Sequence, residues 1–209
     1  MIRIPTAYSR YLHPFVRLAT CTALLSLTHS VQADGFHYQI QAATQFVANP
    51  AGELTALKMA WTYDPELAAI LLEDEDLSEA NKAATLKQRA SDILADLAKL
   101  GYFTQLAVDG QAVATAPVQD YQMSLTNDQS LLLSFQLPLK TAIPVVGKKL
   151  SLRLADPDGV GALSYKDPQQ VSLDEALSKR CTSPRLSQEI LDLPNDHKLS
   201  VPIVQLECQ

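Results

Sequence analysis

The stretch that decides the fold is residues 54–110, which read LTALKMAWTYDPELAAILLEDEDLSEANKAATLKQRASDILADLAKLGYFTQLAVDG. Residues 55–63 alternate between two faces, the pattern of a half-buried strand. Asp64 and Pro65 follow, an N-cap residue and a proline suited to the first helical position. The start of the stretch therefore predicts a strand that runs directly into a short helix over residues 67–71.

A long amphipathic helix is predicted from Ser78 to Leu100. Apolar residues recur there at three- and four-residue steps, the spacing of one helix face: Ala83, Leu86, Ala90, Ile93, Leu94, Leu97 and Leu100. Gly101 is placed to end the helix. A strand over residues 103–108 should follow, and Asp109-Gly110 is typical of a two-residue hairpin turn.

Four consecutive acids, Glu73, Asp74, Glu75 and Asp76, precede the long helix. Carboxylates attract hard cations such as calcium, but an EF-hand loop over this cluster would need Gly at Glu79 and Glu at Thr85. The preferred interpretation is structural, because acids before a helix interact well with its N-terminal partial charge.

Further hairpins lie on both sides of this stretch. Alternation predicts strands over residues 36–46, 121–125, 131–137, 150–154 and 201–206, with a short helix at 173–177. Pro202 suggests that the last strand lies at a sheet edge. The fold class expected is α+β: a single antiparallel sheet of hairpins, with one long and one short helix packed on one face.

The N-terminal segment resembles an export signal. It carries Arg3, Arg10 and Arg17, then an apolar run at 18–27 and the small-x-small pattern of residues 31–33. The run is too short to span a membrane. A lipoprotein site at Cys21 is a minor alternative. The domains expected are a signal peptide at 1–33 and a single domain at 34–209.

The mature chain is acidic. Removing residues 1–33 takes three arginines and no acid from 17 basic and 23 acidic residues, which leaves 14 against 23, a formal charge of −9. General electrostatic binding to nucleic acid or anionic lipid is therefore not expected. No later apolar run is long enough to cross a membrane.

Two cysteines follow the signal, Cys181 and Cys208. An exported chain with two thiols predicts one disulfide between them. A metal site formed with His197 is the alternative, although the spacing matches no compact thiolate motif.

Catalytic motifs are not found. The sequence has no nucleophile elbow, phosphate-binding glycine loop or zinc-protease helix, and we therefore expect a protein that is not an enzyme.

Several short motifs carry a family resemblance. They are Trp61-Thr62-Tyr63-Asp64, Leu71-Leu72-Glu73-Asp74, Leu100-Gly101-Tyr102-Phe103-Thr104, Val108-Asp109-Gly110, Pro117-Val118-Gln119-Asp120-Tyr121, Leu133-Ser134-Phe135, Leu137-Pro138-Leu139 and Asp156-Pro157. In order and spacing, from about Ala33 to Pro157, the chain resembles the domain of unknown function 1007 family. Such proteins are described as periplasmic components of ABC-type transport systems, often linked with zinc, nickel or cobalt uptake.

The resemblance implies a metal site at the mature N-terminus. Family members typically begin with a His-Pro-His motif, whereas this chain has Ala-Asp-Gly-Phe-His at residues 33–37, and only His37 matches. Asp34 and the terminal amine are the groups that could join His37. The cofactor implied is a divalent ion such as zinc, and no cofactor is otherwise expected.

Three functions remain open. The first is a periplasmic, non-catalytic accessory or binding protein for divalent-metal uptake, partnered by a membrane metal transporter or another periplasmic protein. The second is a protein-interaction module without a metal site, which predicts an exposed apolar patch or an unpaired sheet edge. The third is a hydrolase that uses the acidic cluster, which predicts a pocket with convergent acids.

Overall fold

The structure is a computed structural model that describes residues 38–192 and 198–209. Strands dominate it: β1 (Tyr38–Ala48), β2 (Glu53–Tyr63), β3 (Thr104–Val108), β4 (Gln111–Ala112), β5 (Tyr121–Leu125), β6 (Leu131–Pro144), β7 (Lys149–Leu154), β8 (Gly161–Ser164), β9 (Val171–Leu173), β10 (Arg185–Asp192) and β11 (Lys198–Glu207). The helices described are α1 (Pro65–Leu71), α2 (Lys82–Lys99) and α3 (Glu175–Ser178), with short 3₁₀ turns η1 (Gly101–Phe103) and η2 (Pro168–Gln170).

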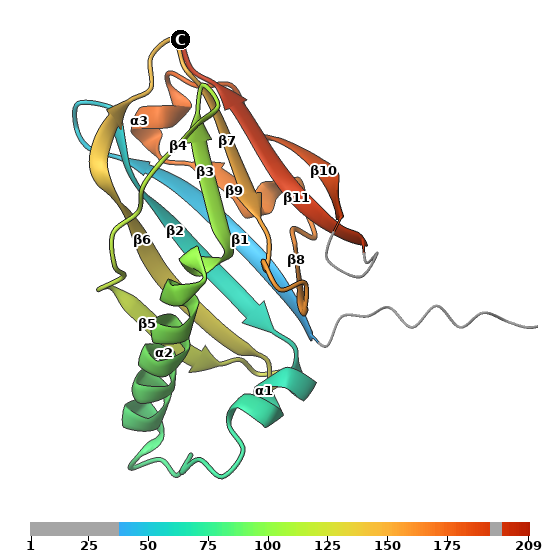
Figure 1. Ribbon diagram of the computed structural model, residues 1–209. Helices are drawn as coiled ribbons and strands as arrows, with labels where there is room; N and C mark the ends of the chain where they lie inside the picture. Colours follow the sequence, from blue (N-terminus) through green and yellow to red (C-terminus); the bar gives the residue numbers. More distant parts are fainter. Residues whose placement is uncertain (1–37, 193–197) are drawn as a thin grey trace, which may run out of the picture. The chain divides into compact units, whose positions relative to one another are not determined.

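These strands form two sheets (Figure 1). The six-stranded sheet has the order β5-β6-β2-β1-β8, and β9 also pairs with β1. The five-stranded sheet has the order β10-β11-β7-β3-β4. Buried residues of both sheets belong to one hydrophobic cluster, so the sheets pack face to face as a β-sandwich.

The expected fold class, one antiparallel sheet with a long and a short helix, is therefore wrong. Strand accounts for 49% of the chain, in two sheets, and the described residues form three α-helices. The error has a physical cause: alternation shows that a strand has one buried face, but not which sheet it joins. β1 also pairs in parallel with β8 and β9, and both of these strands lie far from β1 in the sequence.

The hairpin predictions are confirmed locally. β1 pairs antiparallel with β2, β5 with β6, and β3 with β4 across the two-residue turn at Asp109 and Gly110. Both turn residues have positive φ, 49° and 78°, which matches the right-handed twist of a hairpin.

The long helix is also confirmed, with a later start than predicted. It begins at Lys82 instead of Ser78, and Leu86, Ala90, Leu94 and Leu97 are buried. Its end is as expected, because Gly101 follows with a φ of 62°. α2 packs against β5 (Figure 1).

An aromatic cluster lies in the core. Trp61 on β2 is fully buried. Its ring stacks on Phe103 at a centroid distance of 6.0 Å and meets Phe135 edge-on at 5.1 Å. Phe103 is in η1, directly after α2, and Phe135 is in β6. These contacts therefore hold the C-terminal end of α2 against the inner face of the six-stranded sheet.

Residues 113–116 join the two sheets at one side. Val113 donates its N–H to Leu106 of β3 at 2.8 Å, in the five-stranded sheet. Lys140 of β6 donates to Ala114 at 2.9 Å, and Ala116 donates to Pro138 of β6 at 2.8 Å. At another point the sheets also meet where β8 contacts β11.

The prediction that the last strand is a sheet edge is wrong. β11 pairs with β10 on one side and with β7 on the other. Pairing with β7 begins at Ile203, so Pro202 lies just beyond the residues that face that strand. The edge strand beside β11 is β10, which the sequence pattern did not reveal.

Within the described residues, no helix combines the length and the apolar character needed to cross a membrane.

Candidate functional site

The residues expected to bind metal, Asp34 and His37, lie outside the described part of the chain, as do the predicted signal peptide and His197. Over residues 38–192 and 198–209, no group of three or more His, Cys, Asp or Glu side chains could hold a metal ion. The first described residue, Tyr38, is bonded directly to His37 in the chain. The surroundings of Tyr38 are therefore the described structure closest in sequence to the predicted site.

Tyr38 belongs to a buried polar cluster at the start of β1. Its hydroxyl donates to Oδ2 of Asp156 at 3.0 Å, although 118 residues separate the two. Asp156 is only 2% exposed, and it also accepts from the backbone N–H groups of Gly161 at 2.8 Å and Asp158 at 2.9 Å. Both carboxylate oxygens are thus engaged, as a buried charge requires.

The local sequence explains this arrangement. Residues 156–159 read Asp-Pro-Asp-Gly, and the N–H of Gly159 donates to the carbonyl of Asp156 at 3.1 Å, which closes a turn. This confirms that the segment is a turn. Gly161 has no space for a side chain, because a Cβ there would lie 2.1 Å from the Tyr38 ring. Glycine therefore lets the ring of Tyr38 lie directly on the backbone of β8.

Burial and charge together hold the proton on Tyr38. Burial raises the pKa of its hydroxyl above the usual value, and the charge of Asp156, the hydrogen bond to it and the charge of Asp158 raise that pKa further. Burial also raises the pKa of Tyr63, which is 4% exposed, with an added contribution from Tyr38. Tyr38 therefore stays a hydrogen-bond donor, and Asp158 is an exposed carboxylate close enough to affect it.

The acidic cluster that precedes α2 has a structural role. Asp76 accepts from the backbone of Ser78 at 3.0 Å and from the amide of Asn81 at 2.6 Å, and these bonds lower the pKa of its carboxyl. Glu75 lies 3.8 Å from Arg89, whose Nε also donates to the carbonyl of Leu71. All four acids are exposed, and none lines a described pocket.

A groove of about 590 Å³ crosses the outer face of β3, β7 and β11. Its polar lining includes Gln105, Ser151, Arg153 and Gln205. Arg153 donates to Gln105 at 3.1 Å and forms an ion pair with Glu189 of β10. Its Nε is buried with no hydrogen-bond partner among the described residues. No local sequence pattern marks this groove, because its residues come from separate strands.

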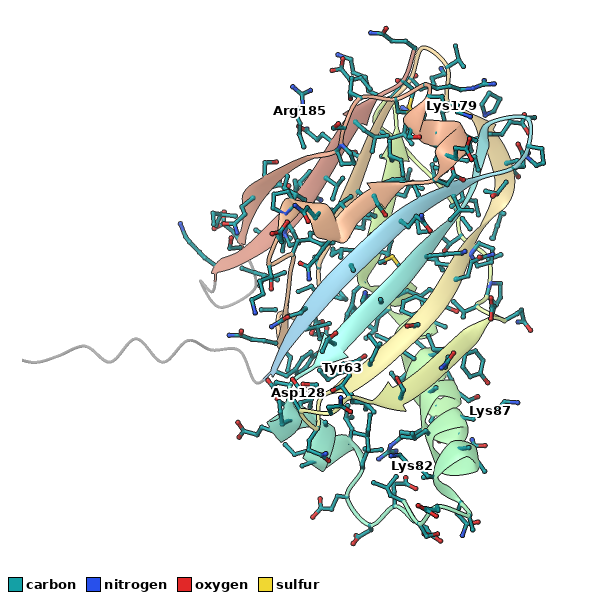
Figure 2. The ribbon with its side chains drawn as sticks, turned by 180° about the vertical axis from the view of Figure 1, so that it is seen from behind. Tyr63, Lys82, Lys87, Asp128, Lys179 and Arg185 are labelled. Carbon is teal, nitrogen blue, oxygen red and sulfur yellow. A yellow bond between two sulfur atoms is a disulfide. The ribbon has the colours of Figure 1, made fainter. Side chains whose placement is uncertain are left out.

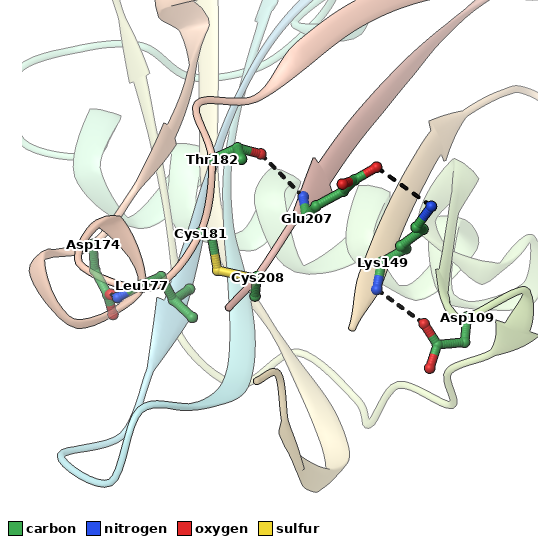
Figure 3. The surroundings of a disulfide bond; sticks show 8 residues. All are labelled: Asp109, Lys149, Asp174, Leu177, Cys181, Thr182, Glu207 and Cys208. Atoms are coloured by element: carbon green, nitrogen blue, oxygen red, sulfur yellow. Dashed lines mark hydrogen bonds and ion pairs between the residues drawn. A yellow bond between two sulfur atoms is a disulfide. The ribbon is translucent and has the colours of Figure 1, made fainter. Parts of the chain in front are cut away.

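The predicted disulfide forms. Cys181 bonds to Cys208 across 27 residues, as Figure 3 shows. Near it, Glu207 donates its N–H to the hydroxyl of Thr182 at 3.1 Å and pairs with Lys149 of β7 at 3.5 Å. The bond therefore fastens the segment after α3 to the end of β11, and the thiols are not free to bind metal.

These features define a mostly β sandwich protein with a Tyr–Asp cluster near the start of its first described strand. The chain belongs to the DUF1007 family, described as "Protein of unknown function (DUF1007)", whose family profile matches residues 20–195.

No curated protein matches the sequence. Among solved structures, the chain is similar to the crystal structure of AChBP from Bulinus truncatus, with 8% sequence identity and a TM-score of 0.37. That alignment covers 84% of this chain and 89% of the other. A similarity of this size supports no inference about fold or function.

Proposed function

We propose that the protein is a periplasmic, non-catalytic accessory or binding protein for divalent-metal uptake. Its partner would be a membrane metal transporter or another periplasmic protein. The metal class comes from the sequence resemblance, and one structural observation supports it. Tyr38, the residue after His37, is fixed to the buried Asp156, and the same turn presents the exposed carboxylate of Asp158.

The donor chemistry suits zinc, nickel or cobalt in part. Imidazole and carboxylate groups are common ligands of these ions. Asp156 itself is not available, because both of its oxygens accept hydrogen bonds. Asp158 is the described group that could complement Asp34 and His37. A full donor set is not present among the described residues alone.

Calorimetric titration tests this proposal. The chain from residue 34 onward is titrated with zinc, nickel and cobalt under oxidising conditions. We expect one-to-one binding that is lost in His37→Ala and weakened in Asp158→Asn. Asp96→Asn is the matched control, because Asp96 is an exposed acid on α2 whose ion pair within the described part of the chain is with Lys99. Wild-type binding no tighter than about millimolar, roughly 4 kcal/mol of binding free energy, would refute the metal proposal.

A protein-interaction module without a metal site is the second proposal, and the groove over β3, β7 and β11 favours it. Exposed amides and hydroxyls beside Ile203 suit an extended polypeptide, which needs both polar and apolar contacts. A photo-crosslinking residue at Gln205, tested in the periplasm, should capture a partner. The same photo-crosslinking residue placed at position 41, in exchange for Gln41 on β1 of the other sheet, is the control. Equal labelling at both positions would contradict the groove as the binding surface.

A further inference from the structure

β10 is the longest free strand edge among the described residues. It pairs only with β11, and both views place it at the periphery of the five-stranded sheet, with Arg185 at the rim (Figures 1 and 2). The other described edges are short or covered: β4 has two residues, β8 has four, and α2 packs against β5. A free edge leaves alternate backbone N–H and C=O groups without strand partners.

The edge of β10 has little of the usual protection. Proteins discourage pairing at an edge with proline, β-bulges or charged side chains, lysine above all. Residues 185–192 read RLSQEILD and contain no proline, glycine or lysine, and their charges are of both signs: Arg185, Glu189 and Asp192. Pairing with β11 is continuous from Arg185 to Asp192, without a bulge. Ile190 is 56% exposed on this strand. The strand is therefore regular enough to accept another.

The sequence of β10 is complementary to itself. In an antiparallel strand pair, hydrogen-bonded and non-hydrogen-bonded residue pairs alternate. A two-fold axis between the strands passes through the centre of one such pair, so one residue lies opposite its own copy. With the axis at Gln188, two amides face each other, Leu186 lies opposite the partner's Ile190, and Ser187 lies opposite the partner's Glu189. Arg185, which pairs with Glu207 in its own chain, is then diagonal to the partner's Glu189, which pairs with Arg153 in that chain, and the long side chain of Arg185 can reach it.

The neighbouring registers are poorer. An axis at Glu189 would place two carboxylates directly opposite each other and Leu186 opposite an aspartate. An axis at Ser187 would pair only residues 185–189 within the strand, instead of residues 185–191. The register centred on Gln188 therefore combines the greater length with apolar pairs and opposite charges.

We propose that the protein forms a two-fold symmetric homodimer in which β10 pairs antiparallel with β10 of a second copy, with the axis at Gln188. The two five-stranded sheets then form one continuous sheet through the dimer. The interface does not depend on the metal proposal, because it lies on a different strand from Tyr38 and Asp158.

Cysteine crosslinking tests both the contact and its register. The chain from residue 34 onward has no free thiol, because Cys181 and Cys208 are bonded to each other. Gln188→Cys should give a disulfide-linked dimer when the protein is treated with diamide, since each new thiol faces its own copy. Ile190→Cys is the control on the same edge, and it should not crosslink because it faces the partner's Leu186.

Sedimentation measures the dimer without a crosslink. Gln188→Lys would place two ammonium groups opposite each other and should raise the dissociation constant at least about fivefold. Gln41→Lys, an exposed change on β1 of the other sheet, should leave that constant unchanged. The proposal is overturned if wild-type protein stays monomeric at its highest soluble concentration. Equal crosslinking of Gln188→Cys and Ile190→Cys would also overturn it, because the register would then be wrong.

Discussion

At the scale of single residues, the contact between Tyr38 and Asp156 is the most consequential. A carboxylate that is 2% exposed depends on every donor it has, since an unmet buried charge is costly. Tyr38→Phe removes one of three donors and keeps the ring that lies on Gly161. The variant therefore isolates the hydroxyl from the packing.

We expect Tyr38→Phe to lower the free energy of unfolding at neutral pH by about 1–3 kcal/mol, measured by urea denaturation. Tyr121→Phe is the control, because no hydrogen bond of the Tyr121 hydroxyl is found among the described residues, and its change should stay below about 0.5 kcal/mol. Equal effects of the two substitutions would show that the hydrogen bond to Asp156 contributes nothing.

The same tyrosine predicts how stability depends on alkaline pH. The pKa of Tyr38 is higher in the folded protein than in the unfolded chain, as are those of Tyr63 and Tyr165. A raised folded pKa contributes stability that is fully present below the unfolded pKa of about 10 and is lost as the pH rises above it. Unfolding free energy should therefore fall above about pH 10, and less steeply in Tyr38→Phe than in Tyr121→Phe. Parallel curves for the two variants would contradict this assignment.

At the scale of elements, Asp174 joins a helix to a strand. Its Oδ1 accepts from the N–H of Leu177 at 2.9 Å and caps α3. Its Oδ2 accepts from the N–H of Ala48 at 2.5 Å, where the register of β1 shifts. One side chain thus accepts a hydrogen bond from a backbone N–H at the start of a helix and another from a backbone N–H at the irregular end of a strand.

This double role gives a graded prediction. Asp174→Ala should cost more unfolding free energy than Asp64→Ala, which removes only the cap of α1 and should cost about 1 kcal/mol. The additional loss reflects the unpaired N–H of Ala48 and should be about 1 kcal/mol or more. Thermal or urea unfolding of the two variants measures the difference. A larger loss in Asp64→Ala would contradict the contact with β1.

Elements also show what the sequence could predict. β1 and β2 were predictable because strict alternation flanks a turn, and the sheet buries one side of each strand. β10 was not, because a free edge buries little and so imposes no clear period on Arg185–Asp192. The Tyr38–Asp156 contact was also beyond local patterns, since it joins residues 118 positions apart. The disulfide was predictable because only two cysteines follow residue 33, where the predicted signal ends.

At the scale of the whole molecule, the Cys181–Cys208 bond fastens the last strand to the rest of the fold. It closes a segment of 27 residues that contains all of β10 and β11. In the chain-entropy view, such a bond stabilises chiefly by restricting the unfolded chain.

Replacing both cysteines with serine should therefore lower unfolding free energy by roughly 3 kcal/mol. The dithiothreitol-treated wild type should match the double variant in urea denaturation, and dithiothreitol should not change the variant further. An effect of dithiothreitol on the variant would show that the reagent acts elsewhere than on this bond.

The parallel pairing of β1 also sets an order of events in time. β1 occupies residues 38–48, yet its partners on one side are residues 161–164 and 171–173. β1 can pair with β2 early, but its opposite edge has no strand partner until almost the whole chain is present. Such distant pairing slows folding, since a long loop must close before the contacts form. The topology therefore delays completion of the six-stranded sheet until residues 161–173 are available.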